Sequence, residues 1–170
     1  MQDLGIFIFV LLEIKILIKN KEVKIFITVG ESSGDFIAFN VMKGLDIYSK
    51  KKLDFKFFGI AGPKMIDFGI KNIFDYKHLN LIGFFEPVLK YFFLSKKIDE
   101  IVEYIIKLKP QLIITIDSKL FSLNLAKRLK NRFLQEKIEI PLVHIVLPTI
   151  WAYRPKRALQ WKGIYDRLYS

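Results

Sequence analysis

The sequence contains no cysteine, which excludes disulfide bonds and thiolate metal sites and fits a protein of a reducing compartment. Only two histidines are present, His78 and His144, so a histidine-rich metal site is not expected either. The composition therefore argues against these two kinds of metal site, and we expect no cofactor.

The sequence also lacks an apolar run long enough to cross a bilayer. Gly5–Leu12 is apolar, but Glu13 and Lys15 end the run well short of the ~20 residues that a spanning helix needs. It has neither the basic region nor the small-residue cleavage site of a signal peptide. We expect residues 1–22 to be an extra leader, packed loosely on the domain or not normally translated. The alternative is a membrane-surface amphipathic extension.

Hydrophobic residues, by contrast, are abundant. They make up 52% of the 170 residues, and aromatic residues make up 15%, which predicts one folded domain with a proper core. The formal net charge of +11 favours an anionic partner, namely a phosphorylated ligand, an anionic lipid or a nucleic acid. No nucleic-acid-binding motif accompanies the basic residues, so we expect no nucleic-acid partner.

Lys24–Asp35 has the pattern that opens a βα unit. Ile25–Val29 is continuously apolar, which is typical of a buried strand, and Gly30 and Gly34 bound the loop after it. Apolar residues then recur at helical spacing over residues 37–48. Glycines in such a loop allow a ligand to approach the backbone, and the free N–H groups of the helix start favour an anion.

Polar side chains in this loop leave two interpretations open. The carboxylates of Glu31 and Asp35 would repel a phosphate, which argues against a simple phosphate loop. Asp35, Ser32 or Ser33 would also serve as an ordinary cap for the helix that follows.

The rest of the chain alternates in the same way. We expect a short helix and a strand within Phe68–Phe74. Further strands are expected at Leu53–Ile60, Leu112–Ile116 and Leu142–Leu147, and further helices at Ser95–Leu108, Phe121–Phe133 and Pro155–Tyr169. This alternation predicts an α/β, Rossmann-like fold, with one parallel sheet, right-handed crossovers and helices on both faces.

Four loops should meet at one edge of that sheet. Each follows the end of an expected strand: Gly30–Asp35, Gly59–Lys64, Asp117 and Pro148–Arg154. Ligands of parallel α/β sheets bind outside the carboxyl ends of the strands. The topology alone therefore predicts that these loops surround a binding site.

Asp117 is the best candidate for a catalytic base. It follows five apolar residues directly, and an ionised carboxylate there is costly unless it is paired or exposed at the sheet edge. Its alternative role is N-cap of the next helix. His144 lies within an apolar strand and is interpreted as a core histidine. Trp151 and Arg154 suit a sugar, a base or a phosphate, or else belong to a hydrophobic plug.

The segment from Leu79 to Leu94 is too apolar on every side for one core face. One interpretation is core packing together with a subunit contact. The other is a membrane-surface patch, in which aromatic rings enter the interface and neighbouring lysines meet lipid head groups. The rings assigned to this patch are Phe84, Phe85, Phe92 and Phe93.

Five segments carry a family resemblance: Gly30–Asp35, Gly59–Met65, Leu81–Leu89, Ile116–Leu123 and Pro148–Pro155. In this order and at similar spacing, they resemble the successive motifs of lipid-A-disaccharide synthase. The resemblance extends from about residue 24 to the end of the chain and leaves the leader unexplained.

The resemblance implies a two-domain, inverting glycosyltransferase of the GT-B type that works without a metal. Members transfer diacylglucosamine from UDP to diacylglucosamine 1-phosphate at the cytoplasmic face of the inner membrane of Gram-negative bacteria. Asp117 would be the base, and the apolar patch would meet acyl chains or the bilayer. The residues expected to bind substrate are Gly30, Glu31, Ser32, Ser33, Gly34, Asp35, Gly62, Trp151 and Arg154.

The chain departs from the family pattern in two respects. Lys119, Leu120 and Ser122 replace a proline, a small or acidic residue and an asparagine after the expected base, so the resemblance leaves the local geometry open. The chain also ends at Ser170, before the UDP-binding second domain. An amino-terminal fragment, one half of a split enzyme with a separately encoded carboxyl-terminal half, or a decayed remnant would each fit.

Two functions are therefore expected. The first is the acceptor-side domain, residues 23–170, of the disaccharide synthase. The second is a non-catalytic membrane-surface module that binds an acylated phosphosugar without turning it over.

Overall fold

The computed structural model describes residues 22–49, 52–75, 87–145, 161 and 163–169. The described strands are β1 (Glu22–Val29), β2 (Asp54–Ala61), β3 (Lys71–Asp75), β4 (Leu112–Ile116), β5 (Leu142–Ile145) and β6 (Arg167–Tyr169). The described helices are α2 (Ser32–Tyr48), α3 (Pro63–Phe68), α5 (Pro87–Leu108) and α6 (Lys119–Glu136). Of the expected leader, only Glu22 is described, and it opens β1.

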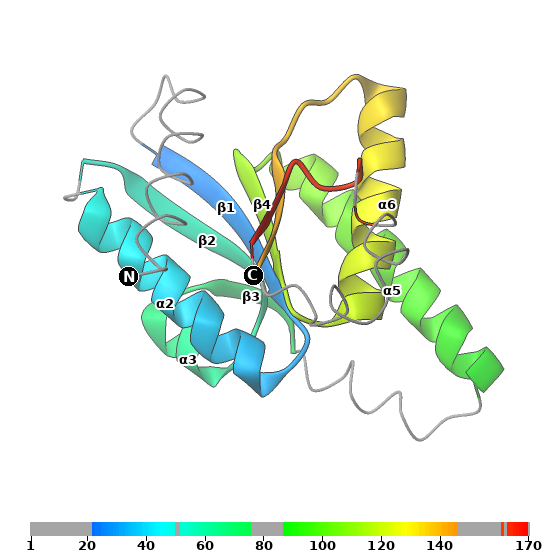
Figure 1. Ribbon diagram of the computed structural model, residues 1–170, viewed down its shortest axis with the longest axis horizontal. Helices are drawn as coiled ribbons and strands as arrows, with labels where there is room; N and C mark the ends of the chain where they lie inside the picture. Colours follow the sequence, from blue (N-terminus) through cyan, green and yellow to red (C-terminus); the bar gives the residue numbers. More distant parts are fainter. Residues whose placement is uncertain (1–21, 50–51, 76–86, 146–160, 162, 170) are drawn as a thin grey trace.

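The strands form one sheet in the order β3-β2-β1-β4-β5-β6, and every described pairing is parallel. Helices α2 and α3 lie on one side of this sheet, and α5 and α6 lie on the other (Figure 1). The predicted Rossmann-like α/β fold is confirmed. The strand order reverses direction between β1 and β4, so their carboxyl ends form the switch point at which such sheets bind ligands.

The two central strands supply the core. All five residues of β4 are buried, and β1 buries Val23, Ile25, Phe26, Ile27 and Val29. Both strands are largely apolar because helices cover both faces of the sheet, although each also buries a threonine, Thr28 in β1 and Thr115 in β4. The rigid centre of the molecule therefore lies directly behind the loops that follow β1 and β4.

Gly59 illustrates how tightly these strands pack. Its φ is +150°, and a Cβ placed there would lie 1.7 Å from the carbonyl oxygen of Ile27 in β1. The pairing of β2 with β3 also changes register between Gly59 and Ile60. The first glycine of Gly59–Met65 thus serves the sheet rather than a ligand.

The prediction of a helix over Pro155–Tyr169 is wrong at its end. Arg167–Tyr169 forms β6, parallel to β5, and Gly163 has a φ of +85° that is unsuited to a continuing helix. The apolar residues Ile164, Tyr165 and Leu168 have helical spacing. The segment nevertheless ends as a strand, because it pairs with the otherwise open edge of β5. Residues 155–160 lie outside the described part of the chain.

Helix α5 begins at Pro87, eight residues before the expected start at Ser95. No helix among the described residues has the length and apolarity needed to cross a membrane.

Candidate active site at the switch point

Asp117 and Ser118, directly after β4, have left-handed backbone conformations. Their φ angles are +56° and +51°, which are rare for residues other than glycine. Each such conformation costs about 1–2 kcal/mol and persists only where the surrounding structure enforces it. The amide of Asp117 donates to the carbonyl oxygen of Ile145 in β5 at 3.2 Å, which ties the turn to the sheet. Strain of this kind at a switch point marks a candidate functional site.

The loop after β1 meets this turn at Gly30. A Cβ on Gly30 would lie 2.2 Å from the Cβ of Ser118, so no larger residue fits without moving one of the two loops. Gly34 has a milder constraint, since its Cβ would lie 3.2 Å from the Cβ of Val29. Both glycines are buried. They allow backbone to approach backbone, which brings the ends of β1 and β4 together.

The carboxylate of Asp117 has two described hydrogen-bond partners. The hydroxyl of Ser33 donates to Oδ2 at 3.1 Å, and the amide of Ser118 donates to Oδ1 at 2.7 Å. Asp117 is half-buried. Ser118 is the N-cap residue of α6, and no side-chain cap bond is present. Asp117 therefore does not cap α6, and its carboxylate is oriented but retains acceptor capacity on both oxygens.

Asp35 has a different environment. It is 4% exposed, and its Oδ2 and Oδ1 accept the amides of Lys64 and Met65 at 3.0 and 3.1 Å. These are the otherwise unpaired N–H groups in the first turn of α3. Asp35 thus caps α3 rather than the helix in which it lies, so its interpretation as a cap for α2 is wrong. Gly62 is the N-cap residue of α3, and its Cβ would lie 2.4 Å from Cγ of Asp35.

The remaining side chains of the first loop are exposed. Glu31 is the N-cap residue of α2 but makes no side-chain cap bond, and Ser32 and Ser33 follow it in the first turn. Of the three, only Ser33 has a described hydrogen bond to the turn after β4. Three of the four expected loops therefore meet through Gly30, Gly62 and Asp117. Trp151 and Arg154, in the fourth, lie outside the described residues.

Sequence reasoning missed the polar cluster beneath Asp117. The buried hydroxyl of Thr115 lies 2.7 Å from Nδ1 of His144 and 3.2 Å from the hydroxyl of Tyr165. Burial raises the pKa of Tyr165, although its hydrogen bond with Thr115 opposes the rise. The signal was present, since Thr115 is a polar residue within an apolar strand, two residues before Asp117. The interpretation of His144 as a core histidine is confirmed, because it is fully buried.

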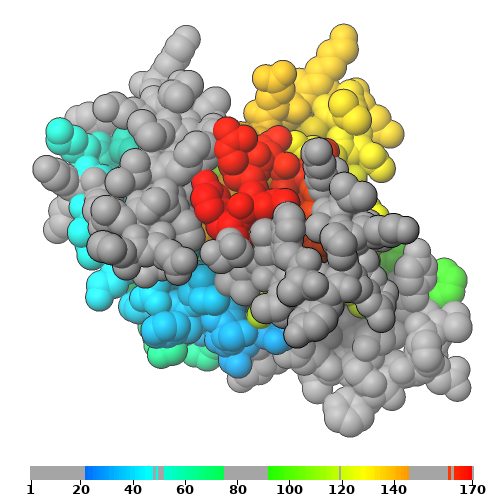
Figure 2. All heavy atoms as spheres, in the orientation of Figure 1, coloured from blue at the N-terminus to red at the C-terminus, as the bar shows by residue number. Residues whose placement is uncertain are grey.

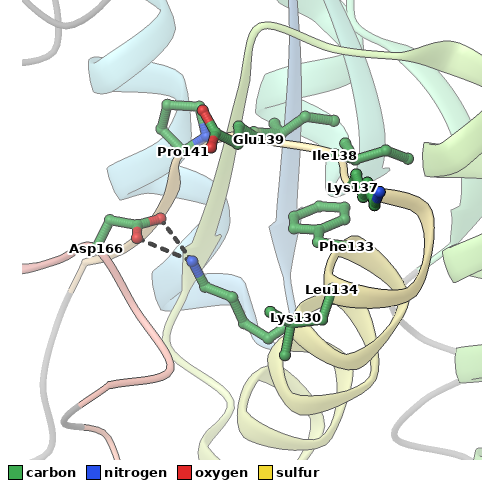
Figure 3. A pocket seen from close by; sticks show the side chains of 9 residues that line it. Lys130, Phe133, Leu134, Lys137, Ile138, Glu139, Pro141 and Asp166 are labelled. Atoms are coloured by element: carbon green, nitrogen blue, oxygen red, sulfur yellow. Dashed lines mark hydrogen bonds and ion pairs between the residues drawn. The ribbon is translucent and has the colours of Figure 1, made fainter.

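One hollow lined by described residues lies elsewhere. It encloses about 720 Å³ beside the end of α6 and the start of β5, which is the amino-terminal edge of the sheet. Its lining includes Phe133 and Pro141, and the ion pair between Lys130 and Asp166 closes one side (Figure 3). Asp117 lies at the opposite end of α6, so this hollow is not part of the candidate active site.

A protein-family model described as lipid-A-disaccharide synthetase matches residues 25–170. The chain belongs to the lipid-A-disaccharide synthetase family. It is 39% identical over 148 residues to the lipid-A-disaccharide synthase of Rickettsia prowazekii (strain Madrid E). The corresponding enzymes of Rickettsia felis and Rickettsia bellii (strain OSU 85-389) are 38% and 36% identical over the same length.

Each of these alignments covers 86% of this chain but only 36–37% of the relative. The chain thus spans little more than a third of the length of the curated relatives that it matches.

Proposed function

We propose that this chain is the acceptor-side part of a lipid-A-disaccharide synthase, which transfers diacylglucosamine from UDP to diacylglucosamine 1-phosphate. The observation that carries the proposal is the carboxylate of Asp117, held in a left-handed turn at the switch point. The printed names of the relatives and the match over residues 25–170 support it.

The proposed chemistry is direct displacement with inversion. The acceptor hydroxyl attacks the anomeric carbon of the donor sugar, a new carbon–oxygen bond forms, and the bond to UDP breaks. Asp117 takes the proton of the attacking hydroxyl as general base. The donors from Ser33 and the Ser118 amide would fix the rotamer of the carboxylate and leave each oxygen able to accept a further hydrogen bond.

The first loop would form one wall of the acceptor site. Glu31, Ser32 and Ser33 are exposed at the start of α2 and are free to meet sugar hydroxyls. Asp35 and Gly62 would act indirectly, because the contact between them places α3 and its loop. Trp151 and Arg154 complete the proposal as contacts for a sugar and for phosphates.

The nucleotide-binding half is a second component of the proposal. In the GT-B arrangement UDP binds the other domain, whether it is encoded on the same polypeptide or separately. Mixing this chain with the separately produced carboxyl-terminal half of a rickettsial relative should restore disaccharide formation from the two lipid substrates. No turnover, together with tight binding of diacylglucosamine 1-phosphate, would favour the non-catalytic binding module instead.

We also propose that the protein associates peripherally with the cytoplasmic face of the inner membrane. Phe92 and Phe93, on the first turns of α5, are 65% and 47% exposed. The ammonium group of Lys97 lies 6.0 Å from the ring of Phe93, and Lys96 is exposed beside it. Exposed rings beside lysines suit an anionic lipid surface. Phe84 and Phe85 belong to the same proposal but lie outside the described residues.

Vesicle flotation tests the membrane proposal. Replacing Phe92 and Phe93 by Ser should release the protein from vesicles that contain anionic phospholipid. The matched control replaces Leu120 and Leu134, which are 76% and 80% exposed on α6, by Ser. The control should still float, and equal behaviour of the two double variants would reject the proposed surface.

A further inference from the structure

Four buried polar side chains form a connected cluster below the candidate base. Thr115 comes from β4, His144 from β5, Ser122 from α6 and Tyr165 from the segment before β6. Each is no more than 7% exposed. The hydroxyl of Tyr165 contacts the carbonyl oxygen of Ser122 at 2.8 Å, in addition to its contact with Thr115. One cluster thus joins the last described segment of the chain to the start of α6. That last segment, red in Figure 2, reaches the surface of the molecule.

The direction of the hydrogen bonds follows from the groups involved. A carbonyl oxygen only accepts, so the Tyr165 hydroxyl donates its single proton to Ser122. The single Thr115 proton has two acceptors within reach, the Tyr165 hydroxyl at 3.2 Å and the carbonyl oxygen of Val143 at 3.4 Å. In either case Thr115 accepts from Nδ1–H of His144 at 2.7 Å. With the Thr115 proton directed to Tyr165, the chain of donors runs from His144 through Thr115 and Tyr165 to Ser122. This assigns the proton of His144 to Nδ1.

Ser122 connects this series of hydrogen bonds to the left-handed turn at Asp117 and Ser118. Its hydroxyl donates to the carbonyl oxygen of Asp117 at 2.7 Å, and its amide donates to the carbonyl oxygen of Ser118 at 2.9 Å. A single residue, 1% exposed, therefore binds the carbonyl groups of both strained residues. Without the hydroxyl, the Asp117 carbonyl would lose this partner, and the turn would lose a contact that opposes its relaxation.

We propose that Ser122 is a positioning residue for Asp117 and that Tyr165, Thr115 and His144 lock Ser122 to the sheet. Ser122 does not touch substrate in this proposal. Instead, Ser122 holds the backbone conformation of Asp117, and this conformation determines where the carboxylate lies. The effect on turnover rests on the function proposed above, whereas the effect on the backbone of Asp117 does not. The two are therefore measured separately.

The first measurement is made on the 170-residue chain alone. In Ser122→Ala, the backbone ¹³C shifts of Asp117 and Ser118 should move away from left-handed values towards those of an averaged turn. Ser122→Thr, which restores a hydroxyl, should move them back. Ser49→Ala is the matched control, since the buried Ser49 hydroxyl donates to the carbonyl oxygen of Asp46 at 2.9 Å in α2, away from this turn. It should leave the shifts of Asp117 unchanged.

The second measurement is turnover of the chain reconstituted with a carboxyl-terminal half. Ser122→Ala should lower kcat about tenfold to a hundredfold while KM for the acceptor changes little, because misplacing a catalytic group slows the chemical step. Ser122→Thr should recover most of this loss. Ser49→Ala should retain the original kcat.

Tyr165→Phe tests the hydrogen bonds among His144, Thr115 and Tyr165. The substitution keeps the ring against Trp161 and His144 and removes only the hydroxyl. The ¹⁵N signals of His144 should show Nδ1–H in the original protein and a changed tautomer balance in this variant. Tyr104→Phe is the control. A predominant Nε2–H form in the original protein would overturn the donor chain.

Left-handed shifts retained in Ser122→Ala would overturn the positioning role, and so would altered shifts with unchanged kcat. A third outcome separates the two proposals. If Ser122→Ala alters the Asp117 shifts but the unsubstituted protein shows no turnover after reconstitution, the proposed function is rejected. The positioning role is retained in that case, because the change in the Asp117 backbone has been observed.

Discussion

Two aspartates near the carboxyl edge of the sheet show that the same type of side chain can have a structural role in one place and a candidate catalytic role in another. Asp35 is buried, and each of its oxygens accepts a backbone amide of α3. Asp117 is half-buried, in a strained turn, and accepts from Ser33 and from its own neighbour, Ser118. The first carboxylate has its principal acceptor sites occupied by the fold, whereas the second is oriented but still open to a substrate.

The comparison teaches that proximity to a strand end does not by itself identify a carboxylate as a catalytic base. Both aspartates lie in segments that directly follow strand ends. What separates them is the source of their hydrogen-bond donors. Buried backbone donors that lack another partner make a carboxylate structural, because removing it leaves them unsatisfied. The following predictions test this division.

Asp117→Asn should have the largest effect, and on turnover. If Asp117 is the general base, as proposed, its loss should lower kcat of the reconstituted enzyme by about 10²–10⁴-fold. The free energy of unfolding in urea should change by less than about 1 kcal/mol, because the amide oxygen can keep the bond from the Ser118 amide and the exposed Ser33 hydroxyl can rotate to accept from the amide nitrogen. Turnover within a factor of two of the original would remove Asp117 from the mechanism.

Asp35→Ala should instead reduce stability. The amides of Lys64 and Met65 lose their acceptors, so the free energy of unfolding should fall by about 2–4 kcal/mol. Urea denaturation measures the loss, and the control is Asp67→Ala on the exposed side of α3. If the two variants were equally stable, Asp35 would not be a structural cap.

Two glycine substitutions sharpen the contrast. Gly30→Ala places a methyl group against Ser118, and Gly62→Ala places one against the Asp35 carboxylate. Each should cost about 1–3 kcal/mol, since the crowded groups must move. Gly30→Ala should also lower kcat measured per folded molecule, whereas Gly62→Ala should leave it nearly unchanged. Equal kcat values for both variants would contradict the assignment of the two loops.

Alkaline pH should weaken the Asp117 side of the sheet through Tyr165. Burial raises the pKa of Tyr165 above its ordinary value of 10.0, so the unfolded chain loses this proton at lower pH than the folded protein. The native state then binds more protons, and stability is lost as the pH rises above about 10, by up to about 1.4 kcal/mol per pH unit. Urea midpoints should fall less steeply with pH in Tyr165→Phe. Parallel pH profiles would exclude this contribution.

Ser33→Ala should have the smallest effect. Its hydrogen bond to Asp117 spans 3.1 Å at an exposed position, so stability should change by less than about 0.5 kcal/mol. Because the bond helps to orient the carboxylate, kcat should fall by a few-fold, about 1 kcal/mol in barrier height. Ser49→Ala, which removes a hydroxyl bonded to Asp46 and away from Asp117, should match the original protein.

Much of the site was predictable because strand ends in a parallel sheet converge. Periodicity located β1, β2 and β4 to within a few residues, and the loops at Gly30 and Asp117 lie together as expected. The role of Asp35 was not predictable, because its partners Lys64 and Met65 are about thirty residues away. Local spacing also misassigned Arg167–Tyr169, where pairing with β5 overrides helical periodicity.

By itself, the sequence determined the α/β alternation, the apolar central strands and the motifs of a lipid-A-disaccharide synthetase family member. These follow from local hydrophobic patterns, which each segment carries independently of its neighbours. Only the tertiary structure decided which aspartate has its oxygens occupied by backbone amides and which aspartate retains oxygens available to a ligand. That decision depends on donors from distant segments, such as the amides of α3 and the hydroxyl of Ser122, which meet the carboxylates and turns only after the chain has folded.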